Sequence, residues 1–398
     1  MTTSPPAAPI ALLVTLMVAS QVAITIFLPS LPAMAEDLGT SQALALMTVS
    51  AYLGTFAIAQ LVIGPLSDAM GRRRPLVAGL ILLTLGGIAC ALAPNIGFLI
   101  VARMVQAVGG CACLVIARAI VRDTTDGPAA TRAMAYLGMS LAIAPMIAPL
   151  VGGQLEIHFG WQSSFLFTAL LGAGALIATL LTLEETLPPA ARRPVRAGGL
   201  VHTYLRLVRL KRYMGYSLSI GAMGATFQAF IAGTPVAFIV VMGVSPENFG
   251  FFILTAPAGY IIGNFISSRL AHKVSRESMI WMGATLAVAG TGSMVALALI
   301  GQDTPYTLLL PVLVYALGSG FLAPNCLAGA LTSVEPAVAG SAAALGGFIQ
   351  IGAGFLSTLV VASLVQTSFL QLGALMLGCT ILSWLFFMVL VRRDNPVV

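Results

Sequence analysis

Long apolar segments recur along the whole chain, and they restrict its fold more than any other feature. Each is about 20 residues long, enough to cross a hydrocarbon core of ~30 Å. The chain is 59% hydrophobic and only 8% charged, whereas soluble domains contain roughly a quarter charged residues. Because backbone polar groups in lipid must bond within their own segment, we predict an all-α polytopic membrane protein. The twelve expected transmembrane helices lie at 10–33, 43–65, 75–93, 97–120, 131–152, 163–183, 213–240, 249–268, 278–301, 306–328, 338–361 and 367–391.

The distribution of charge predicts how these helices are oriented. If the N-terminus is cytoplasmic, the two tails and the cytoplasmic loops contain all 19 Lys and Arg residues except Arg103. The charged residues of the opposite loops are all acidic, namely Glu36, Asp37, Glu156, Glu247 and Asp303. The positive-inside rule therefore favours cytoplasmic N- and C-termini. The net charge of +6 follows from topology, so we do not expect a nucleic-acid partner.

A polar segment at 184–212 separates two sets of six spans. We predict an N-terminal six-helix half at 1–183, a cytoplasmic linker at 184–212 and a C-terminal six-helix half at 213–398. The linker could include a short amphipathic helix at 200–212. When the halves are aligned with an offset of about 204 positions, "GPLSDAMGRRRPL" (64–76) faces "SRLAHKVSRESMI" (268–280), and Arg72 matches Arg276. Duplicated halves related by an axis along the membrane normal are a transporter architecture.

The loop after the second span combines glycines, one acid and several arginines. Gly64 would allow two helices to approach closely, and Gly71 would allow a tight turn. Asp68 can accept charge-assisted hydrogen bonds from Arg72 or from a nearby helix N-terminus. With Arg73, these residues form a candidate conformational latch that holds in one state and breaks in another. The alternative is that the arginines only fix topology.

The fifth span contains a second unusual stretch, "GMSLAIAPMIAPLVGG" (138–153). Pro145 and Pro149 each remove a backbone donor, which predicts a kink in the helix. Gly152 and Gly153 would allow close packing with a neighbouring helix. A kinked helix with only a packing role is the alternative to a functional one.

Several of these stretches resemble the major facilitator superfamily. The 64–76 loop resembles its signature pattern G-x-L-x-D-R-x-G-R-R, with Ala69 as the departure. The 138–153 stretch, "RMVQAVGG" (103–110) and "IFLPSLPAMAEDLG" (26–39) resemble motifs of its drug exporters, especially the Bcr/CflA-like branch of twelve-span drug:proton antiporters. The resemblance implies a fold of two pseudo-symmetric six-helix bundles that work by alternating access. The family's usual proton-carrying aspartate in the first span is replaced here by Thr25.

Arg103 is the one basic residue expected inside a span, and no carboxylate lies deep in any span. A mid-span arginine costs ~2.5–3.5 kcal/mol on insertion scales, so it needs compensation. Thr25 is expected at a similar depth, and Gln21 and Gln106 could add acceptors. Three roles remain open: Arg103 donates to backbone carbonyls and glutamines, contacts an anionic or carbonyl-bearing substrate, or reaches outward to Glu36 or Asp37.

If Arg103 contacts substrate, Glu36 or Asp37 would be the candidates for the proton-coupling group. Polar side chains within the apolar runs of the second half are further candidates for substrate contact, since such groups usually face the bundle interior. Gln228, Asn325 and Gln350 are the main ones. Each could equally hold neighbouring helices together.

The architecture predicts a membrane transporter, and the family resemblance implies a secondary transporter of a bacterial inner membrane that exports a drug or secreted metabolite, driven by inward proton flow. Export of an endogenous anion such as a siderophore, or uptake or uniport on the same scaffold, are the alternatives. An enzyme is not expected, because the histidines lie in loops and no catalytic motif is present. We expect a small-molecule substrate, protons and the lipid bilayer as partners, no cofactor or metal, and a monomer.

Overall fold

The computed structural model describes residues 9–125, 127–189, 192, 197–271, 273–302, 304–335, 338–364 and 369–392. Some residues that entered the sequence argument lie outside these ranges. They are Arg193, Arg196, His272, Asp303 and Arg393.

The chain divides into two compact units. The first comprises residues 1–41 and 51–197, and the second comprises residues 42–50 and 198–398. The division near residue 197 falls inside the segment expected to be a linker. The helices of the first part of the chain are α1 (Ile10–Thr25), η1 (Leu28–Ser30), α2 (Leu31–Asp37), α3 (Gln42–Met70), α4 (Arg73–Ala91), α5 (Ile96–Thr124), α6 (Gly127–Phe159) and α7 (Gln162–Thr182).

The second part of the chain begins with a short helix in the expected linker and continues with six long helical segments. These elements are α8 (Ala197–Val208), α9 (Lys211–Pro235), η3 (Val236–Val241), α10 (Pro246–Ile253), α11 (Thr255–Leu270), α12 (Arg276–Leu299), α13 (Pro305–Thr332), α14 (Ala339–Ser363), α15 (Phe369–Phe387) and η5 (Met388–Arg392). Pro235 does not end the seventh span, because the chain continues as the π-helical turn η3.

Twelve helical segments among the described residues are long and apolar enough to cross a membrane. The prediction of twelve transmembrane helices is therefore confirmed, and the protein is a multi-pass membrane protein. Several helices extend beyond the apolar run that predicted them. The clearest example is α6, which covers 127–159 where 131–152 was expected.

The long α5 corrects one detail of the charge distribution. Arg118 was expected in a loop, but it lies within α5, six residues before the helix ends at Thr124. Its side chain is exposed, in contrast to Arg103 on the same helix. Arg103 is thus not the only arginine within the helical part of a span.

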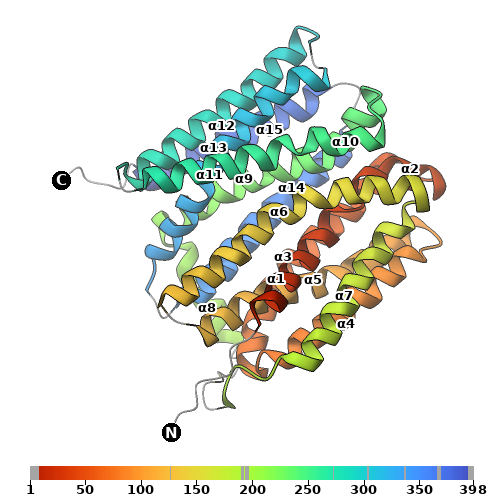
Figure 1. Ribbon diagram of the computed structural model, residues 1–398. Coiled ribbons are helices and arrows are strands. Elements are labelled where there is room, and N and C mark those ends of the chain that lie inside the picture. The colour runs from red at the N-terminus through yellow and green to blue at the C-terminus, as the bar shows by residue number, and fades with distance from the viewer. Residues whose placement is uncertain are drawn as a thin grey trace. The chain divides into compact units, whose positions relative to one another are not determined.

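In the first unit, α4 packs against both α5 and α7, and α1 packs against α5, α6 and α7. Figure 1 shows α4 and α7 lying side by side. Gly109 explains how closely α5 approaches α4, since a Cβ at this position would collide with the backbone of Gly79 and Leu83. Small residues at such crossings let helix backbones come together where no hydrophobic effect drives them.

In the second unit, α13 packs extensively against α11 and α12, and α9 packs against α14 and α15. The close pair α12 and α13 is visible in Figure 1. Gly283 of α12 and Gly318 of α13 lie against each other's backbone. Both units therefore use the same small-residue packing.

Candidate functional site

Arg103 is fully buried in the first unit, with 0% of its surface exposed. Its Nη1 donates to the backbone carbonyl of Ala23 at 2.8 Å and to Oε1 of Gln106 at 2.5 Å. Gln106 in turn donates from Nε2 to Oγ1 of Thr168 on α7 at 3.0 Å. Arg103 thus links α5 to α1 directly and to α7 through Gln106.

The position of Ala23 explains why its carbonyl is available. Ala23 lies among the last four residues of α1, which ends at Thr25. Carbonyls in the last turn of a helix have no partner within the helix. The chain then enters the short η1 segment, which has Pro29 in its first turn. Because proline has no N–H to donate, the prolines after α1 favour a break within the span, and Arg103 satisfies a carbonyl that the break leaves free.

Aromatic rings enclose the guanidinium. Its Cζ lies 4.2 Å from the ring centre of Tyr52, 4.4 Å from that of Phe27 and 5.7 Å from that of Phe165. A desolvated cation over an aromatic face gains ~2 kcal/mol or more. The rings thus compensate part of the charge. No described carboxylate contacts Arg103, and its Nε and Nη2 have no hydrogen-bond partner among the described residues. We call Arg103, Gln106, Phe27, Tyr52 and Phe165 the arginine cluster.

Of the three roles open for Arg103, these contacts agree with donation to a carbonyl and a glutamine. Gln106 is the acceptor that the sequence predicted. Thr25 is buried, but its hydroxyl donates to the backbone carbonyl of Gln21 at 3.3 Å rather than to Arg103. The side chain of Gln21 is half-buried. Phe27 and Tyr52 were missed by sequence reasoning, although Phe27 belongs to the 26–39 stretch that resembles a drug-exporter motif.

The latch loop forms a network around Arg72, which is 2% exposed. Its Nε donates to Oδ2 of Asp123 at 2.6 Å, and its Nη1 lies 2.6 Å from Oδ1 of Asp68 and 2.7 Å from Oγ of Ser67. Burial lowers the pKa of Arg72, but hydrogen bonds and charge from Asp123 and Asp68 outweigh this effect and raise it above its usual value. The expected Asp68–Arg72 contact is present, and Asp123 joins it from the end of α5.

Glu185, which follows α7, completes this network. Its carboxylate accepts the backbone N–H of Arg72 at 2.8 Å and that of Arg73 at 3.4 Å, at the start of α4. An anion at a helix N-terminus satisfies free donors and favours the helix dipole. Arg73 also donates from Nε to the carbonyl of Leu183 at 2.8 Å. Sequence reasoning missed Glu185 and Asp123, whose only signal was their place at the ends of two spans.

The two glycines of the latch loop have different roles. Gly71 has a φ of +91°, and a Cβ there would collide with the Glu185 carboxylate, so the expected tight turn needs glycine. The close helix contact expected at Gly64 is absent, since an added Cβ would lie 3.9 Å from Cγ1 of Val115, an ordinary contact distance. Gly64 instead accepts a hydrogen bond from Ser67 through its carbonyl at 2.8 Å.

Pro145 and Pro149 are both buried within α6, which continues through them as one helix. Gly152 lies directly against the carbonyl of Ile26, so a Cβ would collide with it. Gly153 is also buried. The expected close packing is therefore present at Gly152, where α6 meets the end of α1.

The three polar residues of the second unit that were candidates for substrate contact differ in their surroundings. Asn325 on α13 donates from Nδ2 to Oγ of Ser267 on α11 at 2.9 Å, which joins two helices. Gln228 of α9 packs over Gly354 of α14, and Gln350 of α14 packs over Gly224 of α9. Both glutamines are half-buried, so their amides remain candidates for contact with a substrate.

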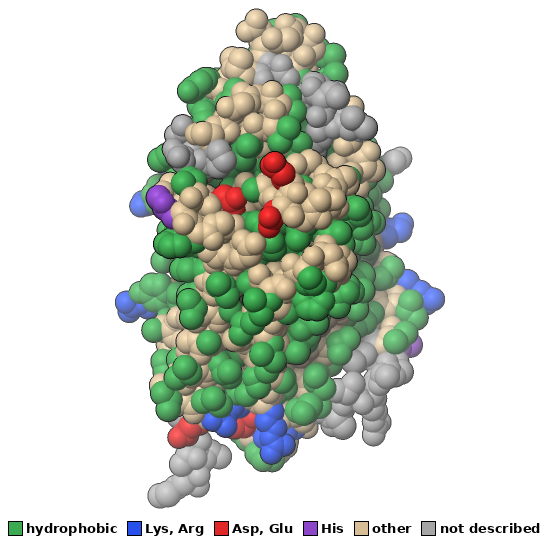
Figure 2. Space-filling view, turned by 90° about the vertical axis from the view of Figure 1, so that its right-hand side faces the viewer, with side chains coloured by type: hydrophobic (Ala, Val, Ile, Leu, Met, Phe, Trp, Pro, Cys, Tyr) green, Lys and Arg blue, Asp and Glu red, His purple; other side chains and the backbone are tan. Residues whose placement is uncertain are grey.

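Acidic side chains gather at one end of the first unit, and Figure 2 shows such a group among hydrophobic and uncharged side chains. Asp37 accepts hydrogen bonds from Nε1 of Trp161 at 2.8 Å and from Nε2 of Gln162 at 3.4 Å. Glu36 is exposed. Glu156 is half-buried, and its Oε2 is buried without a close hydrogen-bond partner among the described residues, although the Ser30 hydroxyl lies near enough to act on the carboxylate. Sequence reasoning placed Glu156 in a loop and did not consider it for coupling.

Comparisons with known proteins agree with this architecture. The family model described as Major Facilitator Superfamily matches residues 13–358. The chain is 31% identical to multidrug resistance protein D of Escherichia coli over 92% of its length and 91% of that protein. It is 24% identical to a bicyclomycin resistance protein homolog of Haemophilus influenzae over 93% of each.

A solved structure of a peptide transporter, named POT and bound to alafosfalin, superposes with a TM-score of 0.77. It is 16% identical and the match covers 96% of this chain and 93% of the other, so the likeness concerns the fold. The predicted resemblance is confirmed by these findings together. The chain belongs to the major facilitator superfamily.

Proposed function

We propose that this protein exports a small organic compound from the bacterial cytoplasm, by alternating access and in exchange for protons. The observation that carries the proposal is its 31% identity, over nearly the whole of both chains, to a protein named for multidrug resistance. The similarity to a bicyclomycin resistance homolog points the same way. In this proposal the protein lies in the inner membrane with both termini in the cytoplasm, as the charge distribution favours.

The arginine cluster then has a structural role in transport. Arg103 is enclosed by rings and bonded to α1 and α5, so it fixes the end of α1 against the rest of the first unit. Substrate contact falls instead to the half-buried amides, of which Gln228 and Gln350 are the best candidates. These two residues are adaptable donors and acceptors that suit uncharged polar compounds.

The proton carrier must differ from the usual one, because Thr25 stands at that position. We place coupling at the acidic group that contains Asp37 and Glu156. Asp37 is held by two donors, and its negative charge acts on Glu156. The Ser30 hydroxyl offsets only part of the cost of burying the Glu156 charge beside Asp37. A proton on the carboxylate removes that cost. Glu156 is therefore the group that takes up the proton, with Asp37 as its neighbour.

Inverted membrane vesicles test both parts of the proposal. Vesicles with an acidic interior should accumulate bicyclomycin, or another member of a panel of antibiotics and dyes, and should lose it when the gradient is collapsed. Accumulation that does not depend on the pH gradient would point to uniport. Compounds that instead accumulate only in right-side-out vesicles would point to uptake, and either result would contradict the proposal.

Substitution of Glu156 tests the coupling residue separately. Glu156→Gln should reduce gradient-driven accumulation to the level of de-energised vesicles, while passive equilibration of the same compound persists. Glu335→Gln is the matched control, since Glu335 forms an exposed pair with Arg206 at 2.9 Å in the second unit. Unchanged gradient dependence in Glu156→Gln would exclude this residue as the proton carrier.

A further inference from the structure

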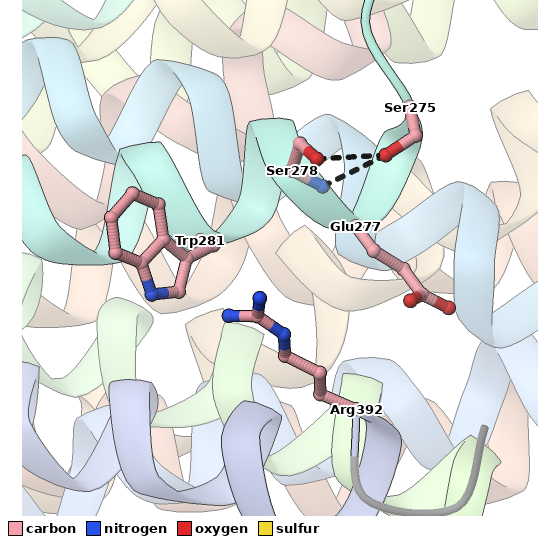
Figure 3. Close-up of a pocket in the computed structure, with 5 residues that line it drawn as sticks. All are labelled: Ser275, Glu277, Ser278, Trp281 and Arg392. Atoms are coloured by element: carbon pink, nitrogen blue, oxygen red, sulfur yellow. Dashed lines mark hydrogen bonds between the residues drawn. The ribbon is translucent and has the colours of Figure 1, made fainter. Parts of the chain in front are cut away.

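A polar pocket lies at the end of the second unit where α12 begins and η5 ends. It has a volume of about 190 Å³ and is lined by Ser275, Glu277, Ser278, Trp281 and Arg392. A water molecule occupies ~30 Å³ of liquid, so the pocket has room for a group as large as a phosphate. Figure 3 shows Arg392 projecting from η5 toward the first turns of α12, between Trp281 and Glu277.

Arg392 is the basic residue of this pocket, and its side chain is exposed. Its one contact among the described residues is from Nη1 to Sδ of Met388 at 3.8 Å, and a thioether is a weak acceptor. The nearby carboxylate of Glu277 already pairs with Nη2 of Arg212 at 2.8 Å. The Arg392 guanidinium therefore has N–H donors that can form charge-assisted hydrogen bonds with an anion in the pocket.

The start of α12 adds positive potential to the same place. This helix has 24 residues, and its N-cap Ser275 accepts the backbone N–H of Ser278 at 3.2 Å. The partial positive charge of the helix start and the guanidinium act on the same volume. The Ser275 hydroxyl donates to Oγ of Ser278 at 2.9 Å, so the Ser278 hydroxyl is the one that can donate to an oxygen in the pocket.

The surroundings indicate which anion can reach the pocket. Trp281 is 40% exposed in the first turns of a membrane-spanning helix, and tryptophans there lie at the level of lipid headgroups. The basic residues Arg269, Lys273 and Arg276 lie at the same end of the unit, in the loop between α11 and α12 and at the ends of those helices. Basic pockets between helices at this depth suit anionic headgroups.

We propose that this pocket binds the phosphate of an anionic phospholipid, with Arg392 as its main contact and Trp281 packing on the glycerol region. The site is separate from substrate transport. It would add a contact between the C-terminal end of the last span and the start of α12, where α15 already packs against α12.

Retention of lipids by the purified full-length protein tests this site. Native mass spectrometry in mixed phosphatidylglycerol and phosphatidylcholine should show preferential retention of phosphatidylglycerol. Arg392→Gln should weaken that binding about fivefold, since one basic residue near an anionic surface contributes ~1 kcal/mol. Arg392→Lys should retain most of it, and Trp281→Ala should lose part. Arg206→Gln, another exposed arginine of this unit, is the control and should bind as the unaltered protein does.

Thermal unfolding in detergent provides a second measurement. Phosphatidylglycerol should raise the melting temperature of the unaltered protein and of Arg206→Gln, but not that of Arg392→Gln. Equal stabilisation by inorganic phosphate would overturn the assignment to a lipid. Equal lipid retention by Arg392→Gln and the unaltered protein, or an equal loss in Arg206→Gln, would overturn the site.

Discussion

The loops after the second helix of each half start from similar sequences but are built differently. In the first unit Arg72 is buried and meets two carboxylates, and the start of α4 is capped by Glu185 from beyond α7. In the second unit the matching Arg276 is exposed, and its one hydrogen bond within the described part of the chain goes to the hydroxyl of Thr332 at 2.9 Å. The start of α12 is capped by Ser275, the residue that corresponds to Gly71.

The difference concerns what each loop connects. The first loop joins α3, α4, α5 and the end of α7 through charge-assisted bonds. In the second loop, a side chain of the loop itself, that of Ser275, accepts a hydrogen bond from a free donor at the helix start. The two halves therefore have an arginine at matching positions, but the two arginines make different contacts. The conformational latch, which we propose for the first loop, needs the carboxylates as well.

Substitution of the matching arginines, Arg72 and Arg276, should give the largest difference in stability between the two loops. Arg72→Ala leaves Asp123, 13% exposed, without its main partner. Loss of one member of a buried pair costs about 3–5 kcal/mol, and the exposure of Asp68 favours the lower end. Arg276→Ala should cost ~1 kcal/mol or less. Unfolding midpoints of the two variants in the same detergent measure this, and equal losses would remove the contrast.

The glycine should give an intermediate effect. Gly71→Ala places a side chain in a left-handed backbone conformation and against the Glu185 carboxylate, which should cost ~1–3 kcal/mol. It should also loosen the cap on α4. At the matching position, Ser275→Gly should cost only roughly a few tenths of a kcal/mol, because glycine is tolerated at an N-cap. The same unfolding assay compares them, and a larger loss for Ser275→Gly would reverse the interpretation.

The smallest effect is expected at the partner of Arg276. Thr332→Val removes one exposed hydroxyl acceptor and should change stability by ~0.5 kcal/mol or less. Transport should be unchanged. A loss comparable to that of Arg72→Ala would mean that the second loop is a latch too, and that the two loops differ less than their contacts indicate.

The sequence was sufficient for the twelve spans, because apolar runs of membrane length admit few folds. It also identified Arg103 and Gln106 as a pair, since three residues of a helix bring them to one face. It could not place Phe27 and Tyr52 over the guanidinium, because their contact depends on how three helices pack. Glu185 and Glu156 were missed for a related reason: nothing in a loop-like position tells which distant backbone or cavity a carboxylate will face.

The arginine cluster has a consequence for biosynthesis. The chain is made from its N-terminus, so α1 and α3 reach the membrane before α5 does. The segments that carry the Ala23 carbonyl and the rings of Phe27 and Tyr52 are therefore synthesised before Arg103 enters the bilayer. Only Phe165 and Thr168 arrive later, with α7. Most of the groups that surround the guanidinium are thus synthesised before the arginine itself.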